Sequence, residues 1–384
     1  MRKRLLITGA SLLLALGFFA LPSFLDYRMN STADHGPYQA SAAAQALHRQ
    51  LWIADLHDDA LLWQRDPLQR HSYGHTDLPR LLEGNVGLQV FAAVTKTPRG
   101  LNYTSNAADS DNVTPLIIAQ RWPRATWSSL LQRALYQSER LQQTERDSQG
   151  LLQIIRSREE LRQALARRNP EQPTLAAILA TEGLHPLEGQ LANVDVLFNA
   201  GYRIAGLTHF FDNELGGSAH GLAKGGLTPF GREVVKRLEQ RHMLIDLAHA
   251  SKPMIDDVLA MATRPLLVSH TGVAGTCPGP RNLSDEHLRR IAAGGGLVGI
   301  GYWDGAVCAT SVDAIIKAIR YSVDLIGVEH VALGSDFDGT IHAPFDTRGL
   351  VLLTDGLLKA GFSAEQITAI MGGNVQRLLL QYLP

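Results

Sequence analysis

The chain has 384 residues, of which 45% are hydrophobic and 19% are charged, and its formal net charge is −1. These values are ordinary for a folded globular protein. The balanced charge, and the lack of a long basic run after residue 4, argue against a nucleic-acid partner.

The N-terminus has the pattern of an export signal. Arg2, Lys3 and Arg4 precede a stretch from Leu5 to Leu21 that is apolar or small throughout. Residues 1–28 are therefore predicted to be a signal peptide or an uncleaved signal anchor, with the rest of the chain exported. A buried N-terminal helix is the alternative interpretation. Residues 29–50 are expected to form a polar tether that leads into a short helix.

Eight apolar runs follow, and near-continuous Val, Ile, Leu and Ala is typical of parallel strands buried on both faces. The runs are IADLHDD (53–59), GLQVFAAV (87–94), LAAILATEG (175–183), RIAGLTH (203–209), MLIDLAH (243–249), PLLVSH (265–270), GLVGIGYW (296–303) and HVALGSDF (330–337). Helix-like stretches lie between most of them. The sequence therefore predicts an α/β fold, a single (β/α)8 TIM-type barrel over residues 51–384, with additional outer helices from an insertion at about 100–170.

Ionisable residues gather where these runs end, and a barrel of this type has its active site at the carboxyl ends of its strands. The strand-end residues are His57, Asp59, Glu182, His209, His249, His270 and Asp336. If the barrel forms, these side chains converge on one mouth. Imidazoles and carboxylates together are the ligands of a divalent metal site.

The pair His57-x-Asp59 can reach one ion, because residues i and i+2 of a strand point the same way. The pattern is weak alone, since His75-Thr-Asp77 is a second copy. We interpret Asp77 as a helix N-cap and His75 as a surface residue or a support behind the site. Glu182 needs a partner if it is buried, and either a bridging position between two metals or a salt bridge would provide one.

His249 and His270 end adjacent predicted strands, which favours imidazole ligation over the structural role of a lone histidine. Asp246 lies three residues before His249 and is expected to point to the other face. Asp336 is expected to face the mouth as general base and then general acid, while Asp338 is assigned to the loop as a cap group.

Two further side chains are candidates for contacting a substrate. His209 ends the fourth predicted strand and could stabilise an oxyanion. Arg281 could bind a carboxylate through its planar fork, although an arginine that ties the loop together is an equal alternative. The only cysteines, Cys277 and Cys308, fall in neighbouring loops of the predicted barrel; a disulfide and two unpaired thiols both remain open from the residues alone.

With these residues in place, the chain resembles the membrane (renal-type) dipeptidases, which are zinc peptidases with an amidohydrolase-like barrel. The matching segments are DLHDD (55–59), HTDLPRLLEGNVGLQVF (75–91), TEG (181–183), LTH (207–209), GLTPFGREVVKRL (226–238), LIDLAHAS (244–251), VSHTGV (268–273), PRN (280–282), ALGSDFDG (332–339) and GGN (372–374). They extend from the first predicted strand to the last predicted helix.

The resemblance implies two zinc ions. The first would be bound by His57 and Asp59, the second by His249 and His270, and Glu182 would bridge them. A metal-bridging hydroxide would attack the peptide carbon.

It also implies the roles of the remaining site residues. His209 would contact the scissile carbonyl, Arg281 would hold the C-terminal carboxylate, and Asp336 would handle protons. A Cys277–Cys308 disulfide and a homodimer are expected on the same basis.

The resemblance has two departures, the stretch after LTH that begins at Phe210 and the stretch Tyr302-Trp303-Asp304. Both put the shape of the substrate pocket in doubt. The export signal in front of such an enzyme implies a bacterial protein of the periplasm, or of the inner membrane facing the periplasm.

The sequence thus predicts a zinc dipeptidase that hydrolyses free dipeptides, including those with a C-terminal D-residue. Another amide or lactone hydrolase, or a deaminase, on the same barrel is the first alternative. A barrel that binds metal and peptide without catalysis is the second.

Overall fold

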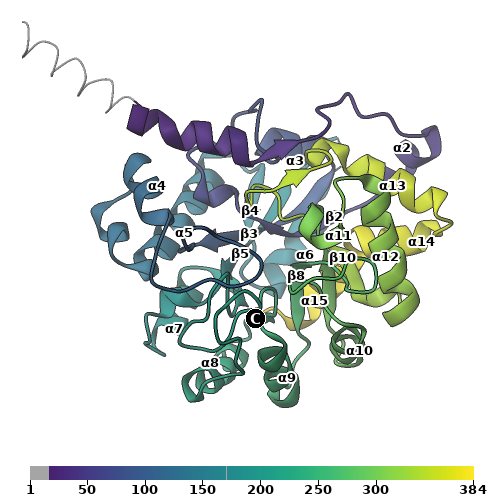
Figure 1. Cartoon of the computed structure of the whole chain (residues 1–384). Coiled ribbons are helices and arrows are strands. Elements are labelled where there is room, and N and C mark those ends of the chain that lie inside the picture. Colours follow the sequence, from purple (N-terminus) through teal and green to yellow (C-terminus); the bar gives the residue numbers. More distant parts are fainter. Residues whose placement is uncertain (1–16, 170) are drawn as a thin grey trace, which may run out of the picture.

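The computed structural model describes residues 17–169 and 171–384. Most of the predicted export signal, residues 1–16, lies outside the described residues. Residues 17–29 form a helix, shown in purple along one side of the molecule in Figure 1. Within the two described ranges, no helix combines the length and the apolar character needed to cross a membrane.

Eight parallel strands close into the predicted barrel. They are β2 (Ile53–Asp58), β3 (Val86–Val94), β5 (Leu175–Glu182), β6 (Tyr202–Gly206), β7 (Leu244–Asp246), β8 (Leu267–Thr271), β9 (Leu297–Ile300) and β10 (Val331–Leu333). Each pairs with the next along the chain, and β10 returns to pair with β2. The prediction of a (β/α)8 barrel is therefore confirmed.

The alternating side chains of the strands fill two separate layers, as period-two geometry requires. In β5, Ala176, Ile178 and Ala180 belong to the cluster inside the barrel. Leu175 and Leu179 belong to the larger cluster between barrel and helices. Because both faces are buried, the strands need no polar face, which explains their continuous apolar sequence.

Helices surround the barrel (Figure 1). They are α2 (Ala42–His48), α3 (Leu78–Glu83), α4 (Val113–Ala119), α5 (Leu130–Asp147), α6 (Arg158–Ala166), α7 (Asn193–Asn199), α8 (Pro229–Gln240), α9 (Lys252–Met261), α10 (Asp285–Ala293), α11 (Asp304–Val307), α12 (Val312–Ile326), α13 (Leu350–Lys359), α14 (Ala364–Thr368) and α15 (Asn374–Tyr382). Asp77 accepts a hydrogen bond from the Arg80 amide at the start of α3, so the predicted N-cap is confirmed. Helix α15 inserts Val375 and Leu378 into the inner cluster.

The stretch expected to be helical, residues 100–170, contains α4, α5 and α6 outside the barrel. It also contains a strand that the sequence did not predict, β4 (Leu152–Ile154), which pairs with the first residues of β5. A three-residue strand is too short to show a periodic pattern, and its pairing partner is supplied only by the fold.

The segment between the N-terminal helix and β2 lies against the barrel. Residues Ser31–Thr32 form β1, which pairs in parallel with β11 (His342–Ala343) in the loop after β10. Helix α2 packs on α13, and the Ser41 hydroxyl donates a hydrogen bond of 2.6 Å to Asp355. The part of the chain predicted as a tether is therefore held on the surface of the barrel.

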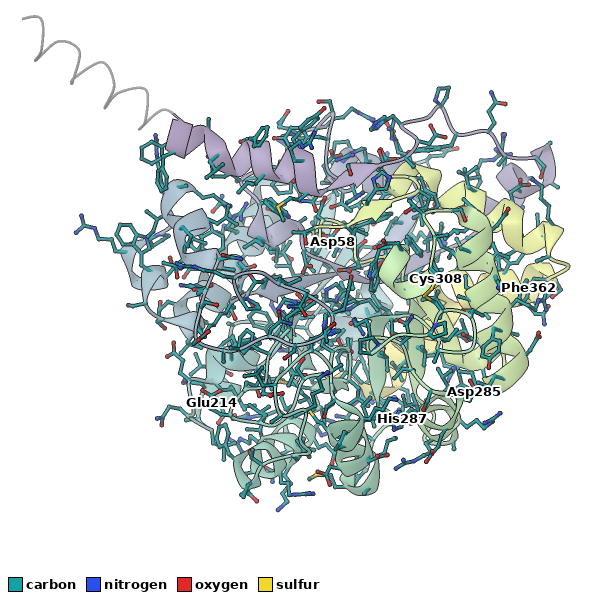
Figure 2. All side chains as sticks on the ribbon, viewed as in Figure 1. Asp58, Glu214, Asp285, His287, Cys308 and Phe362 are labelled. Carbon is teal, nitrogen blue, oxygen red and sulfur yellow. A yellow bond between two sulfur atoms is a disulfide. The ribbon has the colours of Figure 1, made fainter. Side chains whose placement is uncertain are left out.

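Cys277 and Cys308 form a disulfide, as the resemblance implied (Figure 2). It joins the loops that follow β8 and β9, 31 residues apart in sequence. Closing a loop of this length limits the conformational freedom of the unfolded chain and is worth about 3–4 kcal/mol of stability.

We expect the double variant Cys277→Ser/Cys308→Ser to lose about this much free energy of unfolding, as measured by urea denaturation. An unchanged midpoint would contradict this expectation.

Candidate metal centre

All seven ionisable strand-end residues meet at the carboxyl mouth of the barrel. Five of them line a cavity of about 290 Å³, while the His57 and His270 side chains lie beneath it, close to Glu182. The cavity is lined by Asp59, Leu62, Val94, Thr97, Leu101, Asn102, Tyr103, Glu182, His209, Phe210, His249, Arg281, Trp303, Asp336, Asp338, Gly339, Thr340 and Ile341. The structure therefore brings together the residues that the sequence analysis selected, although His209, His249 and Asp336 lie in loops beyond the last paired residue of their strands.

Glu182 occupies the centre of the cluster. Its Oε1 atom lies 3.1 Å from Nε2 of His249 and 3.5 Å from Nε2 of His270. The same oxygen is 3.4 Å from Nε2 of His57, while Oε2 is 3.1 Å from Nε2 of His209. One carboxylate thus faces four imidazoles, and it is the group best placed to be shared between two ions.

A second part of the cluster is formed by carboxylates. His57 Nε2 lies 3.5 Å from Asp59 Oδ1, so the His-x-Asp pair does face one point. Asp336 joins these two residues in a group whose ligand atoms lie within 4.8 Å of one another. Two further groups of this kind share Glu182, one with His57 and His270 and the other with His209 and His249.

Asp246 and Ser269 orient two of the imidazoles from behind. Ser269 Oγ donates to Asp246 Oδ2 at 2.5 Å, and it lies 2.9 Å from Nδ1 of His270 and 3.3 Å from Nδ1 of His57. Fixing Nδ1 turns each Nε2 toward the cavity, which is how supporting residues hold metal ligands. The expectation that Asp246 points to the other face is wrong: alternation along β7 places it on the same inner side as Leu244, where it supports these imidazoles through Ser269.

The electrostatics differ between the histidines of the cluster. Burial opposes the charged form of His57, but Asp59 and Glu182 raise its pKa well above the ordinary imidazole value. Burial lowers the pKa of both His249 and His270 well below the ordinary imidazole value, so each ring keeps a lone pair for ligation. Burial alone would raise the pKa of Glu182, but electrostatic attraction to His209 and hydrogen bonds with His249 and His57 lower it well below its usual range. Glu182 is therefore ionised.

The carboxyl groups of Asp59 and Asp336 have too little positive charge around them to favour the ionised form. Burial and then repulsion from Glu182 raise the pKa of Asp59 to about 7. Burial raises the pKa of Asp336 well above its ordinary value; attraction to His57 opposes this shift, and repulsion from Asp59 and Glu182 adds to it. Divalent cations at this point would supply the missing charge and keep all three carboxylates ionised.

The hydrogen bonding of the cluster also fits a metal. Nε2 of His57 and Oδ1 of Asp59 are buried without a hydrogen-bond partner among the described residues. Nε2 of His249 and Nε2 of His270 face each other at 3.0 Å, so at most one of them can carry a hydrogen between them. Buried polar atoms rarely lack partners, and a shared cation would satisfy these atoms together.

Two residues of the cluster, His249 and Asp336, have a strained backbone conformation. His249 has φ of +63° and Asp336 has φ of +62°, in the left-handed region that side chains other than glycine rarely adopt. Such a conformation costs on the order of 1–3 kcal/mol and persists where the surrounding structure enforces it. The strained backbone at His249 and Asp336 therefore lowers the stability of the fold and directs these two side chains toward the cavity.

Arg281 lies in the cavity with unused donors. Its side chain is buried, and Nη2 donates to the His270 carbonyl at 2.6 Å. Its Nε atom has no partner among the described residues, and its guanidinium carbon lies 5.7 Å from the centre of the Trp303 ring. A buried cation with free donors inside the cavity is suited to a carboxylate ligand.

Sequence reasoning missed Tyr103, which lies in the polar loop of the insertion. Trp303 Nε1 donates to the Tyr103 hydroxyl oxygen at 2.8 Å, and no acceptor for the hydroxyl hydrogen is found in the described part of the chain. A Cβ atom at Gly305 would lie 2.8 Å from this oxygen, so glycine leaves room for it. The sequence offered only the tyrosine itself as a signal, because the position of its loop relative to the barrel could not be predicted.

His75 is not a surface residue, whereas Asp338 lies in the loop after β10 and accepts hydrogen bonds from the backbone amides of His75 and Thr76, as expected of a loop or cap group. Both are fully buried. The backbone amide of His75 donates to Asp338 Oδ1 at 2.7 Å, and Arg65 Nη2 lies 2.7 Å from Asp338 Oδ2. The second interpretation of His75, a support behind the site, is the one that agrees with the structure. The polar loop composition gave no sign of this burial.

A parallel barrel with buried histidines and carboxylates at its carboxyl mouth is the architecture of a metal-dependent hydrolase. Residues 41–382 match the family model described as membrane dipeptidase, peptidase family M19. The chain belongs to this family and is a metallo-dipeptidase.

Individual relatives are similar at moderate identity. The dipeptidase verJ of Clonostachys rogersoniana is 30% identical over 79% of this chain and 75% of the relative. The dipeptidase aclJ of Aspergillus oryzae is 32% identical over 53% of this chain and 51% of the relative, so that match spans about half of the fungal protein. A solved metallopeptidase of Rhodobacter sphaeroides shares the fold, with a TM-score of 0.68 at 22% identity over 87% of this chain and 99% of that one.

Proposed function

We propose that this dipeptidase uses two zinc ions and cleaves free dipeptides, including those with a C-terminal D-residue. The observation that carries the proposal is Glu182, whose two oxygens lie within 3.5 Å of four imidazole nitrogens. His57 and Asp59 would hold one ion and His249 and His270 the other, with Glu182 shared. The Rhodobacter sphaeroides relative was solved with a phosphinate mimic of L-Ala-D-Ala, which supports the C-terminal D-residue.

The positions of the chain's own residues support a role for each of them. Bound divalent ions would polarise the scissile carbonyl and make a water molecule acidic enough to act as nucleophile. Asp336 would accept a proton from the nucleophile and pass it to the departing amine. His209 Nε2, beside Glu182, would donate to the carbonyl oxygen as negative charge develops there.

Substrate length would be set by the two ends of the dipeptide. Arg281 would bind the C-terminal carboxylate, and the free amine would lie near the metal ligands. The cavity of about 290 Å³ has room for a small dipeptide. A third residue would have to displace the walls formed by Tyr103 and Trp303.

The test is hydrolysis of L-Ala-D-Ala, L-Ala-L-Ala and a tripeptide by the full chain, before chelation, after chelation and after zinc repletion. We expect zinc to restore cleavage of both dipeptides and to leave the tripeptide intact. No cleavage by a folded, metal-replete protein would reject the proposal. Equal turnover of the tripeptide would reject the limit on length.

We expect Tyr103→Phe to weaken binding of the substrate carboxylate, because the free hydroxyl hydrogen lies in the cavity with Arg281. KM for L-Ala-D-Ala should rise about tenfold, equivalent to about 1.4 kcal/mol, with little change in kcat. The C-terminal amide of the same dipeptide should show a much smaller change. Tyr27→Phe, at an exposed tyrosine, is the control. Equal changes for acid and amide would contradict this role.

We propose in addition that the chain is exported by its N-terminal segment to the bacterial periplasm, free or anchored in the inner membrane, and acts as a homodimer. Arg2, Lys3 and Arg4 before the apolar stretch support export. Cell fractionation and light scattering of the purified protein test these two points.

A further inference from the structure

The helix of residues 17–29 and the residue that follows it present one buried face to the barrel. Pro22, Asp26 and Asn30 are buried, at a spacing of four residues that places them on one side of the segment. Leu25 packs against a cluster that includes Trp63. A buried carboxylate and a buried amide on this face require polar partners in the barrel.

The partner of Asp26 is Arg65, which also contacts Asp338 in the loop after β10. Arg65 Nε donates to Asp26 Oδ2 at 2.7 Å, and Arg65 Nη2 lies 2.7 Å from Asp338 Oδ2. All three side chains are buried. Asp338 also accepts hydrogen bonds from Thr76 and His75, so the loop is held from several sides.

Asn30 makes a second connection, directly to the backbone of the loop. Its side-chain amide donates to Asp26 Oδ1 at 2.9 Å, and its Oδ1 atom accepts from the backbone amide of Thr340 at 2.8 Å. Beyond Asn30, the Ser31 amide donates to the carbonyl of Ile341 at 3.3 Å. The N-terminal segment thus bonds to the backbone of the loop that begins at Asp336.

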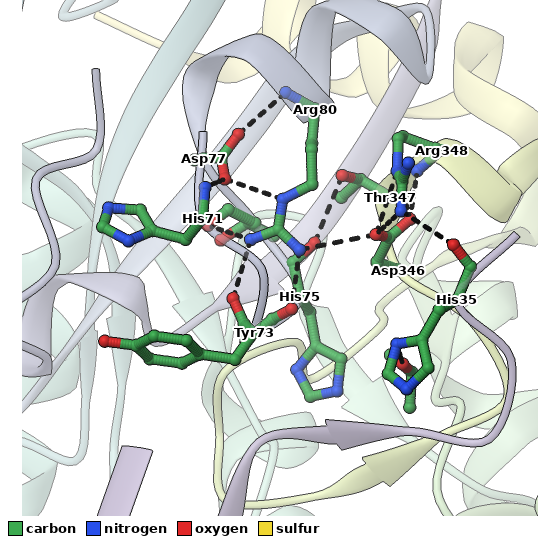
Figure 3. A network of polar contacts seen from close by, with 12 residues as sticks. His35, His71, Tyr73, His75, Asp77, Arg80, Asp346, Thr347 and Arg348 are labelled. Atoms are coloured by element: carbon green, nitrogen blue, oxygen red, sulfur yellow. Dashed lines mark hydrogen bonds and ion pairs between the residues drawn. The ribbon is translucent and has the colours of Figure 1, made fainter. Parts of the chain in front are cut away.

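Further contacts fix the segment after β1 to the same region (Figure 3). Arg348 Nη2 donates to the carbonyl of His35 at 3.1 Å and to Asp346 at 2.7 Å. Arg80 in turn contacts Asp77 at 2.7 Å and Asp346 at 3.4 Å. The N-terminal segment therefore contacts both ends of the loop that leads from β10 to α13.

This loop needs external support. Asp336, Asp338 and Thr340 have φ values of +62°, +60° and +61°, so three residues other than glycine adopt the left-handed region within a short stretch. Asp338, Gly339, Thr340 and Ile341 form part of the cavity wall. A strained backbone keeps its shape only where neighbouring contacts enforce it.

We infer that Asp26 and Asn30 are positioning residues for the loop that presents Asp336, and that the mature enzyme keeps them. The N-terminal segment is then part of the catalytic unit, and any removal of the export signal takes place before residue 26. The effect on catalysis rests on the proposed role of Asp336. The effect on the loop itself does not.

Three variants of the full chain test the inference. Asp26→Asn removes the charge that faces Arg65, Asn30→Ala removes the acceptor of the Thr340 amide, and Asp26→Glu restores the charge. Asp34→Asn, at an exposed carboxylate of the same segment, is the matched control. We expect kcat to fall about tenfold to hundredfold in the first two variants with KM within about twofold, since small misplacements of a reacting group have effects of this size. Asp26→Glu should recover part of the loss.

A second measurement separates this inference from the proposed function. Amide hydrogen exchange of residues 335–343 should become faster in Asp26→Asn and Asn30→Ala, with unchanged metal content and unchanged exchange in α8 and α9. Unchanged exchange in this loop, or wild-type kcat in an enzyme shown to cleave dipeptides, would overturn the inference. Mass spectrometry of the exported protein should find an N-terminus at or before residue 26, and a fully active mature chain that begins after Asn30 would overturn it.

Discussion

Glu182→Gln should lose metal and lose activity by at least about 10³-fold, or about 4 kcal/mol of transition-state stabilisation. The variant keeps the volume of the side chain and removes the negative charge that four imidazoles face. A neutral amide offers one weaker acceptor oxygen, and its NH2 group cannot ligate a cation. Metal content per chain, measured by elemental mass spectrometry, should fall together with kcat/KM.

Glu214→Gln is the matched control, because Glu214 is an exposed carboxylate in the loop after β6, on the same side of the barrel. It should keep full metal content and activity. A Glu182→Gln enzyme with two ions per chain and normal turnover would contradict the central position of this carboxylate. Loss of activity with metal fully retained would assign Glu182 to proton transfer instead of ligation.

Asp336→Asn should lower kcat by about 10²- to 10⁴-fold, the range expected when a general base and acid is removed. Metal content should change little, because the ligand sets proposed for the two ions do not include this residue. Binding of a phosphinate dipeptide mimic, measured by calorimetry, should also be largely retained. The combination separates proton transfer from metal ligation.

Asp304→Asn, at an exposed carboxylate where α11 begins after β9, controls for the loss of a negative charge near the mouth. It should leave kcat unchanged. If Asp336→Asn loses metal in proportion to activity, Asp336 is a ligand, as its grouping with His57 and Asp59 would allow. If kcat is unchanged, its role in proton transfer is wrong.

Much of the barrel could be predicted because parallel strands buried on both faces have a distinctive sequence. Continuous apolar runs such as GLQVFAAV need no polar face, and the eight runs recur at intervals that leave room for helices. The rule that active sites lie at the carboxyl ends of barrel strands then brings His57 and His270 together without any knowledge of distances. Their separation in sequence is irrelevant once the barrel closes.

The parts that were missed depend on contacts that no local pattern encodes. Strand β4 has three residues and exists because β5 offers it an edge. Tyr103 reaches the cavity because its loop folds back over Trp303. His75 was assigned as a surface or supporting residue, and only its burial beside Asp338 decides between the two.

The sequence was enough to predict the barrel, the order of the strand-end residues and the dipeptidase family. The barrel and the order of the strand ends follow from the local apolar pattern and from the geometry that parallel strands impose. The family follows from the resemblance of motifs such as DLHDD and TEG. Three features become visible only in the folded chain: Glu182 faces four histidines, Asp336 lies in a strained loop, and Arg65 links Asp26 to Asp338 of this loop. These features arise from side chains that are distant in sequence and meet only when the chain is packed, so their partners cannot be read from either segment alone.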